Sequence, residues 1–277
     1  MKTIFHWAPG YSPNSAKGSE LAHQALALAQ SLGDIRREAD ALNLLAWDHR
    51  DFRRAFTYWE QAATLYRQVG QWGGLSNCLS QLAYFLLLDG QVDAAQNYLN
   101  ESKLFFEQLN LRATHLLSSV GQIVILRGDY EQARSYFLQD AEISSELGGR
   151  MHYLWARVRL GFAELLARDI TEARQIFAET VRDFQKNGSQ VGVVFILEGM
   201  SSLYVAVGKP DVAARLIGWA DATREKTSDT RPKLEQADIN KGIANCIAKM
   251  GESSYANAYD QGGKLTLDEA VLYALDS

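Results

Sequence analysis

The side chains that could do chemistry are scattered along this chain. Its five histidines are His6, His23, His49, His115 and His152. No His or Cys pair has the spacing of metal ligands, and no Gly-x-Ser-x-Gly turn would expose a nucleophilic serine. No glycine-rich loop ending in Lys-Ser or Lys-Thr would hold phosphates. We therefore expect no enzyme activity, no cofactor and no bound metal.

Charged side chains that stand close together are interpreted as surface groups. Glu142 and Glu146 are one helical turn apart, near the end of a predicted helix, where carboxylates favour solubility. Arg50, Arg53 and Arg54 form a small basic group, but aspartates stand among them, which favours a solvated corner over a phosphate site. No acid/base dyad is indicated.

Composition excludes several other classes of protein. The 277 residues include 28 basic and 33 acidic side chains, a net charge of −5 that gives no general attraction to nucleic acid or to an anionic membrane. The two cysteines, Cys78 and Cys246, lie far apart in helical patterns and are expected to be buried, unpaired thiols. No signal peptide or membrane-spanning run is visible, so a cytoplasmic location is expected.

The elements that would position any site come from an internal repeat. The stretch from Gly128 to Phe137 predicts the corner of a helix-turn-helix, and versions of it recur along the chain. Each version has a key alanine; these are Ala55, Ala95, Ala133, Ala173 and Ala213. The intervals between them are 40, 38, 40 and 40 residues, and such a period indicates a solenoid of stacked helix pairs.

Five complete helix pairs follow one half repeat. The expected first helices are 36–49, 75–89, 112–127, 153–168 and 191–207, and the second helices are 52–69, 92–109, 130–147, 170–186 and 210–226. Residues 1–18 are expected to be an irregular arm, 19–226 the array and 227–277 a helical cap, in which Thr266 and Glu269 form a capping box. Gly18 takes the place of a key alanine, so the array is expected to begin in mid-repeat, as a carboxy-terminal piece of a larger protein would.

Small and large residues alternate at the expected helix contacts. Four residues after each key alanine stands a large apolar residue, such as Trp59 or Phe177, and twelve before it stands a small one, such as Gly161. Asn43 departs from this pattern. The register resembles the tetratricopeptide repeat (TPR) over about 19–226, and the longer interval resembles the MalT-like TPR branch of bacterial transcription regulators and signal-transducing ATPases.

The resemblance implies an all-α, right-handed superhelical solenoid whose first helices line a concave groove. The groove positions carried over from the family are Arg37, Asp40, Leu44, Asn77, Ser80, Tyr84, His115, Ser118, Gln122, Trp155, Val158, Phe162, Phe195, Glu198 and Ser202, with Gln81 and Arg159 adjoining them. Amide, aromatic and charged side chains suit a groove that binds a protein or peptide segment. The implied function is a non-catalytic interaction or sensor arm in signal transduction and transcription regulation.

Three alternatives stay open at the level of sequence. Trp155, Phe162 and Phe195 could instead pack between adjacent helices. The chain could sense a small, sugar-like effector, in a closed pocket near Tyr84, Gln122 and Trp155. It could also be a scaffold that self-associates through the apolar face of its first helix, near Leu21, Ala25 and Leu28.

Overall fold

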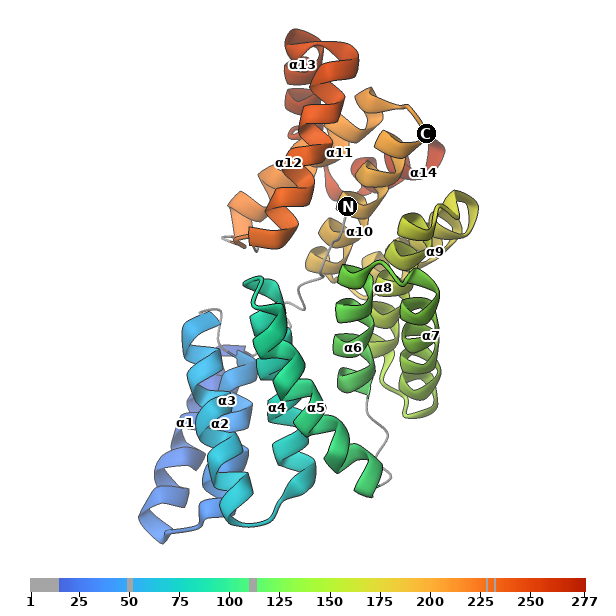
Figure 1. Ribbon diagram of the computed structural model, residues 1–277. Helices are drawn as coiled ribbons and strands as arrows, with labels where there is room; N and C mark the ends of the chain where they lie inside the picture. Colours follow the sequence, from blue (N-terminus) through green and yellow to red (C-terminus); the bar gives the residue numbers. More distant parts are fainter. Residues whose placement is uncertain (1–14, 49–51, 110–113, 228, 232) are drawn as a thin grey trace. The chain divides into compact units, whose positions relative to one another are not determined.

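The computed structural model describes residues 15–48, 52–109, 114–227, 229–231 and 233–277. In these ranges the chain forms fourteen α-helices and no strand, so the expected all-α fold is confirmed (Figure 1). The helices divide between two compact units. The N-terminal unit ends at Ile123 and the C-terminal unit begins at Val124.

The N-terminal unit is a run of helices that pack on their neighbours in sequence. They are α1 (Ser15–Leu32), α2 (Ile35–Asp48), α3 (Phe52–Gln68), α4 (Trp72–Leu88) and α5 (Val92–Leu109). The unit also holds the first part of α6 (Thr114–Arg127). Leu42, Trp59, Tyr66 and Leu79 are among the side chains of its buried core. The expected arm to Gly18 is shorter than predicted, because residues 15–18 are helical; residues 1–14 lie outside the described ranges.

The C-terminal unit continues the same pattern and then departs from it. It holds α7 (Tyr130–Glu146), α8 (Arg150–Ala167), α9 (Ile170–Lys186), α10 (Gln190–Ala206) and α11 (Pro210–Thr227), which pack on their neighbours in sequence. Three more helices follow: α12 (Lys233–Met250), α13 (Glu252–Gly262) and α14 (Leu267–Asp276). They fold back onto the last pair, where α12 packs on α10 and α11, α13 on α11, and α14 on α10 and α11 (Figure 1).

The predicted repeat frame is confirmed by burial and by helix bounds. All five key alanines are 0% exposed, and every second helix of a pair begins three residues before its alanine. In most turns between two helices, one residue adopts the left-handed backbone conformation. This residue is usually glycine, such as Gly128 at φ 87° and Gly208 at φ 80°. Arg168 occupies this place in one repeat, with φ 71°.

The alternation of small and large residues also has its predicted role. A Cβ atom on Gly161 would lie 2.7 Å from the ring of Phe177, so only glycine lets α8 and α9 approach so closely at this point. Asn43, which departs from the small-residue pattern, meets its large partner through a hydrogen bond. The indole Nε1 of Trp59 donates to Asn43 Oδ1 at 3.0 Å.

The C-terminal cap is held by a close crossing of two helix backbones. A Cβ atom on Gly218 of α11 would lie 2.1 Å from the carbonyl oxygen of Tyr259, and one on Gly262 of α13 would lie 2.0 Å from that of Arg215. Side chains at these two positions would therefore push α13 away from α11. The predicted capping box is confirmed at α14, where Thr266 and Glu269 each bond the other's backbone N–H.

Candidate functional site

The predicted groove residues of α2 lie on an accessible surface. Arg37 is exposed and stands 4.0 Å from the carboxylate of Asp40. Asp40 also accepts a 2.8 Å hydrogen bond from the hydroxyl of Tyr66 in α3. Asp40 therefore joins the two helices of its pair, and Arg37 is an exposed predicted groove residue that is available to a ligand.

Buried polar side chains form a seam along α4, α5 and α6. The hydroxyl of Ser102 lies 2.8 Å from that of Ser76 and 2.9 Å from that of Ser80, which joins α5 to α4. Three more predicted groove residues are buried on these helices: Gln81 and Tyr84 on α4, and Gln122 on α6. The side chain of His115 lies outside the described part of the structure.

Two side-chain amides among the predicted groove residues of α4 and α6 have buried polar atoms without a hydrogen-bond partner in the described ranges. Gln122 is 0% exposed, and neither its Nε2 nor its Oε1 has a hydrogen-bond partner among the described residues; the same holds for Oδ1 of Asn77. A buried amide without a partner costs roughly 1–3 kcal/mol per group. Water or a bound backbone segment would relieve this cost.

The predicted groove residues of α8 and α10 are buried among helices. The ring of Trp155 packs 5.2 Å from those of Phe184 and Phe195, and Phe162 packs 5.0 Å from Phe177, measured between ring centroids. Arg159 is buried on the same helix as Trp155. The three aromatic rings thus pack between adjacent helices, which is the alternative that the sequence left open.

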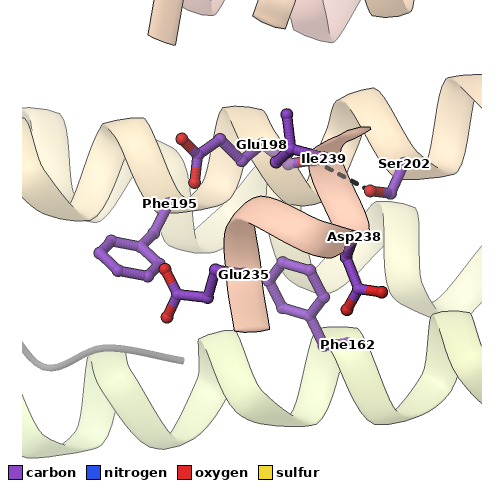
Figure 2. Close-up of a pocket in the computed structure, with 7 residues that line it drawn as sticks. All are labelled: Phe162, Phe195, Glu198, Ser202, Glu235, Asp238 and Ile239. Carbon is purple, nitrogen blue, oxygen red and sulfur yellow. Dashed lines mark hydrogen bonds between the residues drawn. The ribbon is translucent and has the colours of Figure 1, made fainter. Parts of the chain in front are cut away.

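Helix α12 lies over part of this surface. Figure 2 shows Phe162, Phe195 and Ser202 with Glu235, Asp238 and Ile239 of α12 lining one pocket. The space left in this pocket is about 10 Å³, room for a single water molecule. The structure therefore brings Phe162, Phe195 and Glu198 together, as predicted residues of one surface, with a helix of the same chain packed on them.

Glu198 lies in a buried ion cluster, which we define as Glu198, Asp221, Arg224, Asp229 and Arg231. Arg224 of α11 binds Glu198 with two nitrogens, Nε at 2.8 Å and Nη2 at 3.0 Å. Arg231 Nη2 reaches Glu198 Oε1 at 2.6 Å and Asp221 Oδ1 at 2.6 Å, and Arg224 Nη1 reaches Asp229 Oδ2 at 2.5 Å. The cluster ties α10 to α11 and to the segment that leads into α12.

The electrostatics of this cluster favour permanent charges. Burial alone would raise the pKa of Glu198, but the guanidinium groups of Arg224 and Arg231 outweigh it and hold that pKa below its usual range. Burial would lower the pKa of Arg224, and the carboxylate of Glu198 raises it above its ordinary value instead. Both groups stay ionised at neutral pH, so the cluster fixes structure and is not poised to transfer a proton.

A larger cleft lies between α7 and α8, which the sequence did not single out. Its volume is about 420 Å³, and it is lined by Leu138, Ala141, Glu142, Ser145, Glu146, Tyr153, Arg157 and Leu160. Arg157 forms a 2.5 Å ion pair with Glu179 of α9, and the Arg150 guanidinium lies 5.7 Å from the centre of the Tyr153 ring. The sequence signal that could have predicted this cleft is the stripe Tyr153, Arg157 and Leu160 of α8, at i, i+4 and i+7. From the sequence, only the opposite face of that helix was considered.

Other chemistry has little support in the described residues. The described ranges hold no group of three or more His, Cys, Asp or Glu side chains placed to bind a metal ion. Cys78 and Cys246 are buried free thiols, as predicted, and burial raises their pKa values to about 12 and about 11. None of the described helices has the length and apolar character needed to cross a membrane.

Comparisons with known proteins place this chain beside bacterial regulators and helical repeats. No protein-family model matches it. Proteins of Mycobacterium bovis and Mycobacterium tuberculosis named "Putative HTH-type transcriptional regulator" are 26% identical to it over 196 residues. This alignment covers 70% of the chain but 21% of each relative, so the chain spans about a fifth of the length of the curated relatives it matches.

A solved structure with a TM-score above 0.5 shares the fold of this chain. BtubC (BKLC) from P. vanneervenii matches with a TM-score of 0.56 at 16% identity, over 80% of this chain and 95% of that one. Kinesin light chain TPR-like repeats from Podosopora anserina match with a TM-score of 0.45 at 16% identity, over 79% of this chain and 100% of that one. The chain has a TPR-like helical-repeat solenoid fold.

Proposed function

We propose that this chain is a non-catalytic interaction scaffold whose first helices bind a helical segment of a protein partner. The observation that carries the proposal is the seat of α12 on the groove positions of α8 and α10 (Figure 2). Phe162, Phe195 and Glu198, which the family register assigns to ligand contact, already hold a helix. A surface that accepts one helix within the chain is chemically suited to accept another.

The side chains of α12 indicate what kind of segment such a surface prefers. Glu235, Asp238 and Ile239 stand on one face of α12, at i, i+3 and i+4, and all three are buried in the contact. The matching partner is an amphipathic helix that presents aliphatic and acidic side chains together. Its apolar residues would pack on the phenylalanines.

The biological setting that we propose is the sensor or interaction arm of a longer, cytoplasmic transcription regulator. The MalT-like spacing of the repeats and the likeness to HTH-type regulators support this setting. DNA binding would belong to another part of such a protein, because this chain carries a net charge of −5. A bound segment would shift the packing of successive pairs and pass a signal along the array.

The proposed function is tested with a variant that weakens the packing of α12 and with a separate peptide that has the sequence of α12. A labelled peptide covering Lys233–Met250 is titrated into the full chain carrying Ile239→Glu, with binding followed by fluorescence anisotropy. Ile239 is buried in the contact, so the introduced carboxylate should release α12 and open its seat. We expect the peptide to bind this variant at least about tenfold more tightly than the wild-type chain, whose own α12 competes at high effective concentration.

Two further variants make the result specific. Ala237→Glu introduces the same charge at an exposed position of α12 and should leave peptide binding at the wild-type level. Adding Phe195→Ala to the Ile239→Glu variant should weaken peptide binding, because it removes an aromatic ring from the surface on which α12 packs. If the Ile239→Glu variant keeps its helical circular dichroism but does not bind the peptide, the proposed site is ruled out.

The cleft between α7 and α8 supports a second candidate function, the sensing of a small effector. Its volume of about 420 Å³ falls in the range of small-molecule sites, about 300–1,000 Å³. Tyr153, Ser145, Glu142 and Arg157 offer the donors and acceptors that a sugar-like molecule requires. A sugar that raises the melting temperature of the wild-type chain, but not of a Ser145→Leu variant, would favour this function.

A further inference from the structure

The exposed face of α1 is an apolar surface that the proposed function does not use. Leu21, Leu28 and Leu32 are 55%, 60% and 72% exposed, and Ala25 between them is exposed as well. The spacing i, i+4, i+7 and i+11 puts these four side chains in one stripe along the helix. The other side of α1 is buried through Ala22 and Ala29.

Both ends of α1 mark it as the second helix of a pair. It begins at Ser15, three residues before Gly18, just as the other second helices begin three residues before their key alanines. It ends at Gly33, fifteen residues after Gly18, with φ 65°. Gly70, Gly148 and Gly188 stand fifteen residues after their own alanines, with φ of 68°, 69° and 68°.

In the complete pairs, the position that corresponds to Ala25 is buried, whereas counterparts of Leu32 such as Val69 and Leu147 stay 39% and 62% exposed. The counterparts of Ala25, seven residues after each key alanine, are 0–2% exposed: Ala62, Ser102, Asp140, Thr180 and Ala220. What covers them is the first helix of their own pair. Ser102 of α5 bonds Ser76 and Ser80 of α4, and Ile176 of α9, the counterpart of Leu21, closes on Gly161 of α8.

We propose that Leu21, Ala25 and Leu28 of the α1 stripe form the docking surface for one more first helix of the TPR type. The occupant is a helix supplied ahead of α1 by a longer form of the same polypeptide, in keeping with relatives of which this chain spans 21%. It carries a small residue opposite Ala25, as Ser76 lies opposite Ser102, a second small residue opposite Leu21, as Gly161 lies opposite Ile176, and an apolar residue against Leu28. This inference goes beyond the proposed function and does not depend on the seat of α12.

The test completes the pair with a helix taken from the chain itself. Residues 1–14 are replaced by a copy of residues 35–51, which contain α2 and lead directly into the second helix α3 in the native order. The join to Ser15 then repeats the native register. We expect the melting temperature to rise by at least about 3 °C, and amide hydrogen exchange in α1 to slow at least about tenfold.

Three comparisons make the outcome decisive. The same extension with glutamate at its copies of Leu42 and Leu45 should give no gain, because its docking face is then polar. A chain that starts at Ser15 should show the same α1 exchange as the full chain; faster exchange would mean that residues 1–14 cover the stripe, and would overturn the proposal. A wild-type dimer that Leu21→Glu converts to a monomer would equally overturn it, since a second copy would then be the occupant.

Discussion

The Trp59 indole donates a 3.0 Å hydrogen bond to Asn43 at the point where the other pairs bring a small residue against a large one. Trp59 is buried, so this donor has exchanged water for a single side-chain amide. The pair shows how one repeat can replace the small residue of the pattern by a polar one and keep its helices in contact. It also gives a direct prediction.

Asn43→Ala should destabilise the fold by about 1–3 kcal/mol, because the indole N–H loses its acceptor inside the core. In a Trp59→Phe background the same substitution should cost at least about 1 kcal/mol less, since the indole donor is already gone. Urea unfolding of the four proteins measures this coupling. Equal costs in both backgrounds would mean that the hydrogen bond contributes nothing.

Gly218→Ala should cost about 1–3 kcal/mol or more, because its Cβ would meet the carbonyl of Tyr259 at 2.1 Å and force α13 from α11. Gly242→Ala in α12 is the matched control. A Cβ there meets no atom within 4 Å, so the better helix propensity of alanine should add about 0.5–1 kcal/mol. Denaturant midpoints of both variants should therefore move in opposite directions.

Arg168→Gly should stabilise the chain by about 0.5–1 kcal/mol, because glycine adopts φ 71° without the steric cost that arginine bears. Gly208→Arg makes the reverse change in the corresponding turn of the next pair and should destabilise it. Thermal melts of the two variants check both signs. A loss of stability in Arg168→Gly would show that the arginine side chain makes a contribution larger than its backbone strain.

The buried ion cluster should make the fold sensitive to acid. The pKa of Glu198 is lower in the folded chain than its ordinary value of 4.5, so the unfolded chain takes up the proton first. The stability contributed by Glu198 is thus fully present above about pH 4.5 and is lost as the pH falls from there through the lowered pKa. Urea midpoints measured from pH 7 to pH 3 should fall over the lower part of this range.

Glu198→Gln separates this effect from general acid unfolding. At pH 7 it should cost about 3–5 kcal/mol, because it leaves two buried guanidinium groups without their shared carboxylate. The difference from wild type should shrink as the pH drops below 4.5. Glu142→Gln, at an exposed position, should follow the wild-type curve throughout.

Helix positions could be predicted from the sequence because their signals are local. Glycines such as Gly148 and Gly188 end helices by adopting positive φ, and the key alanines mark each helix start at a fixed distance. Both signals recur in most repeats, so the frame can be read even where one copy departs from it, as at Arg168. Even α1 could be placed in this frame, although its start at Ser15 lies inside the stretch expected to be irregular.

The candidate site was harder to predict, because it depends on contacts that the repeat does not encode. Arg224 and Arg231 reach Glu198 from 26 and 33 residues away, across a tail that breaks the 40-residue period. No local sequence pattern predicts that α12 packs on α10. Trp155 and Phe195 were assigned to a groove by register alone, and register does not say whether a neighbouring helix fills the space.

The two ends of the array differ in how many neighbours hold them, and this gives the chain a direction of unravelling. α1 packs on α2, whereas α10 is held by α9, α11, α12 and α14 and by the buried ion cluster. In a solenoid, stability is a sum over the interfaces between adjacent repeats. Unfolding therefore starts at the end held by fewer interfaces and spreads from one repeat to the next. A protease that attacks partly opened molecules should thus shorten the chain from the α1 side, leaving the pairs around α10 and α11 as the last folded core.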